Sequence, residues 1–153
     1  MKKEVPRLET ERLFLDDITE EDTDLIVKWR SDPLVYRFFA DPHRLTAEEH
    51  LNWYQNSYIF NTDRFDYMAR VRDTGKEAVI FGIKRIDDIS AEVSYILAPE
   101  EQGKGYASEA VARLLSFISV EWHCRRALAE IHKDNLRSLM FAEKSGFAIT
   151  SAN

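Results

Sequence analysis

Three strand-like segments follow one another between residues 65 and 97, and no other feature constrains the fold of this chain as strongly. Apolar and polar residues alternate over 65–72, which predicts a half-buried strand. The segment 78–83 is nearly all apolar and rich in β-branched residues, as is typical of a central strand. A third strand pattern covers 92–97. Because the connections between them are short, we expect an antiparallel meander.

Helical patterns lie on either side of this meander, and they predict an α+β fold in a single domain over residues 1–153. Thr19 and Thr46 each precede a carboxylate by three positions, which marks the start of a helix. Gly146 closes the last helical pattern. The expected order is β-α-α-β-β-β-α-β-α, with the elements outside the meander at 12–16, 19–30, 46–56, 107–122, 127–131 and 138–144.

The chain carries 27 acidic and 21 basic side chains, a formal net charge of −6, which disfavours a nucleic-acid partner held by bulk electrostatics. Cys124 is its one cysteine, so no internal disulfide can form. A zinc site built from several cysteines is excluded for the same reason, and we expect no metal. No apolar stretch approaches the ~20 residues of a membrane span. We therefore expect a soluble, cytoplasmic chain with no membrane partner.

A predicted strand leads through a glycine-containing turn into a long helix between residues 92 and 110. Gly103 and Gly105 let the backbone approach a ligand closely, and the free N–H groups of a first helical turn attract anions such as phosphate. An ordinary strand-to-helix connection is the alternative, because short glycine motifs are weakly specific. The segment is not a P-loop, since it lacks the Lys-Ser/Thr pair. It is not a dinucleotide fingerprint either, since no third glycine follows.

This segment resembles the signature of the GNAT superfamily of acyl-CoA-dependent N-acyltransferases, Gln/Arg-x-x-Gly-x-Gly/Ala. The matching residues are Gln102, Gly103, Lys104, Gly105, Tyr106 and Ala107. The expected element order also resembles that of the family over nearly the whole chain, as do the late segments 135–138 and 143–147. The resemblance implies a GNAT-like, mixed and mostly antiparallel central sheet flanked by helices. It also implies that acetyl-CoA donates its acetyl group to a primary amine.

By this resemblance, backbone N–H groups over 102–107 hold the pyrophosphate of acetyl-CoA, and the strand near 96–98 pairs with its pantetheine arm like an added strand. Asn135 and Arg137, in the late segment 135–138, are further implied contacts of acetyl-CoA. Asn135 also suits a helix cap, and Lys104 and Arg137 also suit solvated positions. The implied acetyl-CoA contacts are Ile96, Leu97, Ala98, Gln102, Gly103, Lys104, Gly105, Tyr106, Ala107, Ser108, Asn135 and Arg137.

Acetyl transfer needs a base, because the attacking amine has to be neutral. Glu92 stands where many family members carry that base, and the alternative is an outward-facing strand glutamate. The resemblance further implies an oxyanion donor, here Ile96 N–H. The tyrosine that often protonates the departing thiolate is replaced by Ala142, so Ser138 is the nearest hydroxyl, unless it only caps a helix. This replacement keeps open a catalytically silent acyl-CoA-binding module, and a nucleotide-binding protein is a third possibility.

The first half of the chain is expected to build the acceptor pocket, as in the family. Residues 28–33 and 45–54 resemble the subgroup that acetylates nucleotide-linked amino sugars, whereas the start over 8–13 is similar to enzymes that acetylate ribosomal-protein N-termini. Arg30, His50 and Trp53 are the candidate contacts for a small-molecule amine, through charge and aromatic stacking. Alternatively, the tryptophans belong to the core and His50 is a surface histidine.

Family members of this kind continue past the Gly-Phe pair with a hairpin that completes the sheet, but only residues 148–153 follow Phe147. We therefore expect the final strand to be missing. An uncovered sheet edge favours a covering partner, and a homodimer contact is one.

Overall fold

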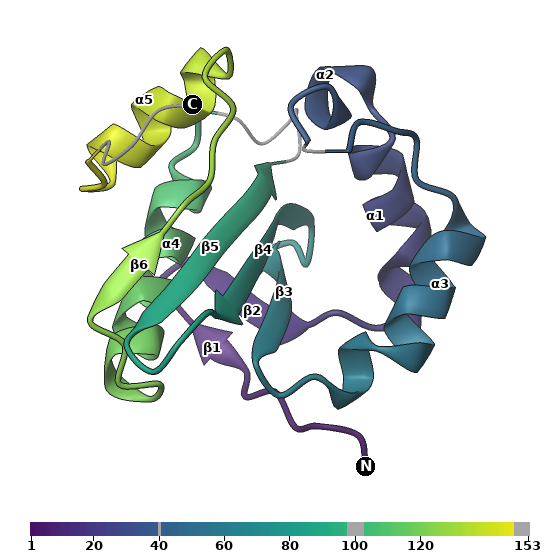
Figure 1. Ribbon diagram of the computed structural model, residues 1–153, viewed down its shortest axis with the longest axis horizontal. Helices are drawn as coiled ribbons and strands as arrows, with labels where there is room; N and C mark the ends of the chain where they lie inside the picture. The colour runs from purple at the N-terminus through teal and green to yellow at the C-terminus, as the bar shows by residue number, and fades with distance from the viewer. Residues whose placement is uncertain (40, 98–102, 149–153) are drawn as a thin grey trace.

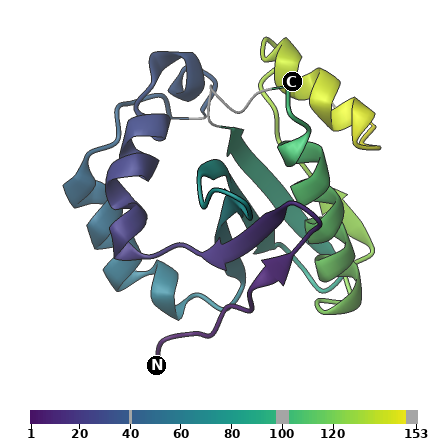
Figure 2. The ribbon, with the colours of Figure 1, turned by 180° about the vertical axis from the view of Figure 1, so that it is seen from behind.

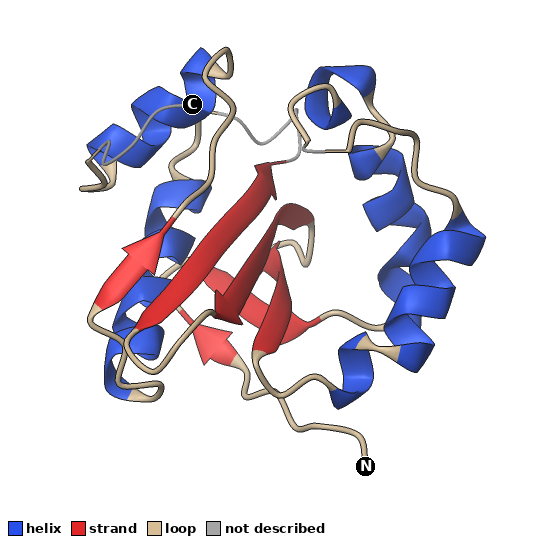
Figure 3. Cartoon of the chain, in the orientation of Figure 1, coloured by secondary structure: helices blue, strands red, loops and turns tan. Residues whose placement is uncertain are grey.

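The computed structural model describes residues 1–39, 41–97 and 103–148, and its centre is a six-stranded sheet in the order β1-β2-β3-β4-β5-β6 (Figure 1, Figure 3). Neighbouring strands are antiparallel except β5 and β6, which run parallel. The predicted antiparallel meander is confirmed by β3, β4 and β5. The strands are β1 (Leu8–Glu9), β2 (Leu13–Asp17), β3 (Arg64–Val71), β4 (Glu77–Arg85), β5 (Ser90–Leu97) and β6 (Arg126–Leu128).

The helices follow the predicted order, with one short addition. They are α1 (Thr23–Arg30), α2 (Pro33–Tyr36), α3 (Ala47–Asn56), α4 (Tyr106–Val120) and α5 (Leu136–Lys144), with 3-10 turns at Glu20–Asp22 and Tyr58–Phe60. Pro33, which ends α1, also begins α2. The Asp32 side chain accepts a hydrogen bond from Leu34 N, and proline suits the first helical position. Both α2 and the two-residue strand β1 were absent from the sequence expectation.

The sheet separates two hydrophobic clusters. Views from opposite sides place α4 on one side of the sheet and α1 with α3 on the other (Figure 1, Figure 2). Leu114 of α4 packs in the larger cluster with Tyr67 and Phe81 of the sheet. The smaller cluster joins Trp29 of α1 and Tyr54 of α3 to the opposite face of the strands. Trp29 is therefore a core residue, in agreement with the alternative given above for the tryptophans.

Strand β3 is buried on both faces, so the expectation of a half-buried strand was wrong. Five successive residues from Phe65 to Ala69 are buried. Phe65, Tyr67 and Ala69 contact the α4 side, and Met68 belongs to the cluster under α1 and α3. Because helices cover both faces at this point, the polar Asp66 is also enclosed, with 5% of its surface exposed.

The parallel pair of β5 and β6 is short. It joins Ser90, Ala91 and Glu92 to residues 126–128, and β5 then continues to Leu97 without further pairing to β6. The predicted strand over 127–131 is wrong at its end, because β6 stops at Leu128 and the chain leaves towards α5. After Glu92, the edge of β5 that faces β6 is therefore no longer paired with that strand, and we call it the open edge of β5. This open edge lies at the end of β5 that leads to α4.

Two of the expectations from the sequence fall on residues outside the described ranges: the contacts assigned to Ala98 and Gln102, and the region beyond Ala148 where a further strand would begin. Over the described residues, no helix is both long and apolar enough to span a bilayer.

Candidate active site

The predicted glycine turn enters α4 through left-handed backbone. Gly103 and Gly105 have φ angles of +83° and +80°, and Gly105 is the N-cap residue of the helix. L-residues other than glycine rarely adopt this conformation. Gly103, Lys104 and Gly105 are exposed, so their backbone can be reached by a ligand. The first-turn N–H groups of α4 have no partners within the helix, which makes this end an anion-binding position.

A cluster of polar contacts fixes this turn to the first strands. Glu109, in the first turn of α4, accepts hydrogen bonds from Arg12 Nε at 2.7 Å, from Arg12 N at 2.9 Å and from the Thr10 hydroxyl. Arg12 Nη1 also donates to the carbonyl oxygen of Lys104 at 2.9 Å. Burial by itself raises the pKa of Glu109, but the bonds from Thr10 and Arg12 outweigh it and lower the pKa below its ordinary value. Sequence reasoning missed this cluster, because its members lie about a hundred positions apart.

The remaining residues of the predicted acetyl-CoA site differ in exposure. Tyr106 is half-buried, and the guanidinium carbon of Arg12 lies 4.6 Å from the centre of its ring. Ala107 packs in the core. Ser108 and Arg137 are exposed. Leu97 ends β5.

Glu92 occupies the last position at which β5 and β6 pair. Its neighbours Ala91 and Val93 pack on the α4 side, so alternation along the strand directs Glu92 to the opposite face, where it is half-buried. Burial alone lowers the pKa of Arg64, but Asp66 and, more weakly, Glu92 help to raise it above its ordinary value. Glu92 therefore lies close enough to Arg64 for electrostatic interaction.

Ser138 lies against β5 and is not the cap of α5. Asn135 is the N-cap residue, and its side chain accepts a hydrogen bond from Ser138 N at 3.3 Å. The Tyr95 hydroxyl donates to Ser138 Oγ at 3.1 Å, and the Tyr95 ring lies 4.8 Å from that of Phe141. Burial raises the pKa of Tyr95, so it stays a proton donor at neutral pH. The structure thus places a second hydroxyl, missed by sequence reasoning, beside Ser138.

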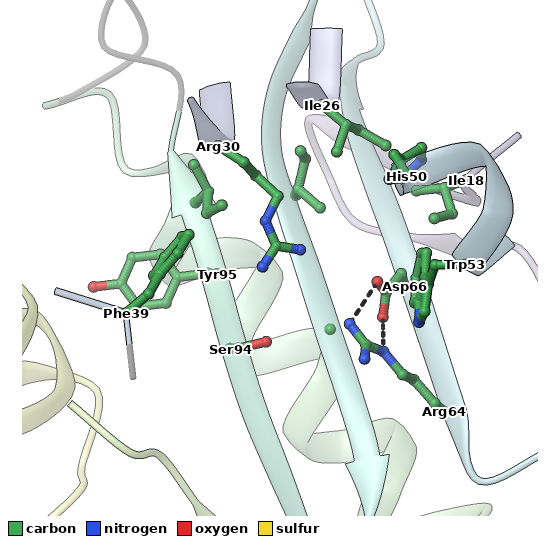
Figure 4. A pocket seen from close by; sticks show the side chains of 13 residues that line it. Ile18, Ile26, Arg30, Phe39, His50, Trp53, Arg64, Asp66, Ser94 and Tyr95 are labelled. Atoms are coloured by element: carbon green, nitrogen blue, oxygen red, sulfur yellow. Dashed lines mark hydrogen bonds and ion pairs between the residues drawn. The ribbon is translucent and has the colours of Figure 1, made fainter. Parts of the chain in front are cut away.

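A cavity of about 110 Å³ lies between the sheet and the helices α1 and α3 (Figure 4). Arg30, His50 and Trp53, the three predicted acceptor contacts, all line it, so the structure brings together residues from two separate helices. Ile96 of the predicted acetyl-CoA site also reaches this cavity. The remaining lining residues are Ile18, Ile26, Phe39, Arg64, Asp66, Ile80, Gly82, Ser94 and Tyr95.

The sheet side of this cavity holds an ion pair that sequence reasoning missed. Arg64 Nε and Nη2 donate to the two carboxylate oxygens of Asp66 at 2.9 and 3.1 Å. Gly82 gives this pair its space, since a Cβ at position 82 would lie 2.9 Å from Ser94 Oγ and 3.1 Å from Asp66 Oδ1. The sequence could have indicated this ion pair, because Arg64 and Asp66 are two positions apart and so lie on one face of a strand.

His50 is buried within α3, with 3% of its surface exposed, so the alternative of a surface histidine is wrong. Burial and, to a smaller extent, the positive charge of Arg30 lower its pKa, which keeps the ring neutral at pH 7. Its Nε2 atom is fully buried and has no hydrogen-bond partner among the described residues. The ring lies 5.6 Å from that of Trp53.

Comparison with known proteins shows the family to which the chain belongs. A family model described as an acetyltransferase (GNAT) domain matches residues 12–148. An uncharacterized protein of Methanocaldococcus jannaschii is 25% identical over 93% of this chain, which spans 29% of that protein's length. The uncharacterized N-acetyltransferase p20 of Bacillus licheniformis is 28% identical, over 92% of this chain and 81% of that protein.

Among solved structures, spermidine N-acetyltransferase from Vibrio cholerae, in complex with CoA and spermine, superposes with a TM-score of 0.81 at 21% identity. The match covers 92% of this chain and 83% of that one. The chain therefore belongs to the GNAT family of acetyltransferases, and the fold expected from the resemblance is confirmed. Its domain is that of an acetyl-CoA-dependent N-acetyltransferase.

Proposed function

We propose that this chain transfers the acetyl group of acetyl-CoA to a primary amine of a small molecule by direct attack. The observation that carries the proposal is the early end of the β5–β6 ladder at Glu92, next to a cavity that accepts side chains from α1 and α3. The open edge of β5 and the free amides of α4 lie at the same end of the sheet. A donor bound along both would bring its acyl group towards the cavity.

The donor's contacts follow from this arrangement. Its pyrophosphate binds the backbone N–H groups that follow Gly103 and Gly105, since neither glycine adds a side chain of its own to the approach. Its pantetheine amides pair with the open edge of β5. Arg137 and Lys104 remain candidate contacts for its phosphates.

In the reaction, the amine nitrogen attacks the thioester carbonyl carbon and the carbon–sulfur bond breaks. Glu92 takes the proton that the amine loses, directly or through water. The Ile96 N–H donates to the carbonyl oxygen as negative charge develops on it. Ser138 donates a hydrogen bond to the departing sulfur, while Tyr95 donates to Ser138 and so orients its hydroxyl. A thiol has a pKa near ~8.5, so this leaving group needs little further help.

The acceptor is an amino sugar linked to a nucleotide in the first instance, and a protein or peptide N-terminus in the second. The cavity lined by Arg30, His50 and Trp53 favours the small molecule. A catalytically silent acyl-CoA-binding module is the alternative from another class, and the Tyr95–Ser138 hydroxyl pair argues against it because it supplies the hydroxyls that Ala142 lacks. The cytoplasmic location and the homodimer stay predictions.

Thiol release from acetyl-CoA, screened over amino sugars, aminated nucleotides and N-terminal peptides, tests the proposal. With the best amine, Glu92→Gln is expected to lower kcat/KM about 100-fold or more over the whole pH range, because the base is lost. Glu77→Gln, which removes a half-buried carboxylate at the far end of the adjacent strand, serves as the matched control and keeps wild-type rates.

Wild-type rates in Glu92→Gln would place the base elsewhere. Binding of acetyl-CoA in calorimetry without thiol release from any amine would instead favour the silent module.

A further inference from the structure

The charges that line the cavity do not balance. Two arginines, Arg30 and Arg64, face a single carboxylate, Asp66. Asp66 is bound through both oxygens by Arg64, which neutralises that pair. His50 adds no charge, because its lowered pKa keeps the ring neutral. One positive charge, on Arg30, is left over in the lining.

Arg30 has the geometry of an anion receptor. It ends α1, and its guanidinium points into the cavity, as Figure 4 shows. Its partner within the described residues is the Phe39 ring, 5.2 Å from the guanidinium carbon, and no hydrogen bond or ion pair joins it to a carboxylate there. Burial and the charge of Arg64 lower its pKa and Asp66 opposes them, but an arginine keeps its charge in proteins.

A half-enclosed guanidinium without an anion is costly, because it has lost water and gained no compensating charge. A ligand that brings a carboxylate or phosphate oxygen removes that cost and gains paired, charge-assisted hydrogen bonds. The unpartnered Nε2 of His50, lining the same cavity and fully buried, is a second polar group that the described residues leave unsatisfied. Of the two, the Arg30 charge indicates that the cavity suits a negatively charged group.

Resting on the function proposed above, we propose that the acceptor is an anionic amine, whose compact carboxylate or phosphate group binds Arg30 while its amino group faces the sheet. The cavity volume of about 110 Å³ suits a compact group of this kind. The same charges disfavour polycationic amines. Polyamines need carboxylates, and the carboxylate that lines this cavity is already paired with Arg64.

Matched amine pairs test this inference. In one pair, alanine is compared with alaninamide; in the other, glucosamine phosphate is compared with glucosamine. Spermidine is the polycation. Thiol release and calorimetric binding are both measured with the acetyl-CoA-loaded or CoA-loaded protein. In at least one pair, the member that carries the acidic group is expected to bind roughly 10–100-fold more tightly than the member that lacks it, as for a hydrogen-bonded charge pair. The pair that discriminates identifies carboxylate or phosphate as the group.

Arg30→Met removes the charge and keeps an unbranched side chain of similar length. It is expected to abolish the preference for the member that carries the acidic group. Arg37→Met is the matched control, because Arg37 is an exposed arginine stacked on Phe38 that does not line the cavity, and it keeps the wild-type preference. Arg30→Lys, which keeps the charge but not the planar fork, is expected to fall between.

Equal binding of the members with and without the acidic group, tight spermidine binding, or an unchanged preference in Arg30→Met would each overturn the inference. Failure of the proposed function gives a different result: no amine then releases thiol. Calorimetry still reports in that event whether the cavity prefers anions and whether Arg30 is responsible.

Discussion

Gly82 lies in the sheet beneath the acceptor cavity, where a side chain larger than a hydrogen atom does not fit. We expect Gly82→Ala to lower the free energy of unfolding by about 1–2 kcal/mol, because its Cβ meets Ser94 Oγ at 2.9 Å and Asp66 Oδ1 at 3.1 Å. Arg64 holds Asp66 through both carboxylate oxygens, so Asp66 cannot yield without breaking that pair. Urea unfolding measures the stability, and the KM of the acceptor is expected to rise.

A double-mutant cycle with Ser94→Ala separates the two contacts. Removing the Ser94 hydroxyl frees the shorter contact, so Ser94→Ala is expected to recover part of the stability lost in Gly82→Ala. Strict additivity of the two substitutions would show that Ser94 is not the obstructing group.

Single residues were predictable where their role is local. Arg30, His50 and Trp53 were predicted as acceptor contacts because a cation and two aromatic side chains stand out in or beside a capped helix, and all three line the cavity. Asp66 and Ser94 were missed, because what places them together is the pairing of β3 and β5 with the strand between them. The sequence holds no record of that register beyond its alternation, and a small polar residue on a strand gives no signal of its own.

At the scale of elements, the entry into α4 combines a backbone requirement with a proposed ligand contact. We expect Gly105→Ala to cost about 1–2 kcal/mol of stability, because φ is +80° and the added Cβ lies 3.3 Å from Arg12 Nη2. The Kd of the Gly105→Ala variant for CoA is expected to rise about tenfold or more, because the added methyl group stands where the backbone approaches the phosphates. Calorimetry with CoA and thermal unfolding measure the two effects.

Gly75→Ala is the control for strain alone. Gly75 has a φ of +72° and lies in the turn between β3 and β4, where an added Cβ would meet no atom within 4 Å beyond its chain neighbours. It is expected to lose similar stability while binding CoA normally. Equal CoA affinity in both variants would show that the α4 turn does not hold the phosphates.

Among whole elements, those with local signals were predicted well. The helix α3 begins as its capping box indicates, since Thr46 Oγ1 accepts from Glu49 N and Glu49 Oε1 accepts from Thr46 N. The end of β6 was not predicted, because residues 129–131 have the composition of a strand but no partner in the sheet. Where a strand stops depends on its neighbour, and the neighbour β5 is distant in the sequence.

For the molecule as a whole, the N-terminal segment is bound to the sheet through a buried lysine. Lys3 Nζ donates to the carbonyl oxygens of Asn61 at 2.9 Å and Arg64 at 2.5 Å, and it lies 3.4 Å from the centre of the Tyr58 ring. Burial lowers the pKa of Lys3 from 10.5 to about 8, with Asp17 and Asp66 opposing the shift. Folding therefore disfavours its protonated form.

This shift predicts how stability depends on pH. Between about pH 8 and 10.5 the unfolded chain keeps the Lys3 proton that the folded chain has lost, so stability rises with pH across this window. Relative to Lys3→Met, in which other titrations cancel, the wild type is expected to gain on the order of 1–3 kcal/mol. Urea unfolding at both ends of the window measures the difference. Parallel curves for the two proteins would contradict a lowered pKa.

The short ladder between β5 and β6 has a thermodynamic consequence. If the donor completes the open edge of β5, it binds the folded chain and has nothing equivalent to pair with in the unfolded one. Its concentration then enters the stability of the protein directly, adding about 2.7 kcal/mol at a hundredfold excess over Kd. A melting temperature of this enzyme would accordingly report the acetyl-CoA and CoA content of the solution as much as the chain itself.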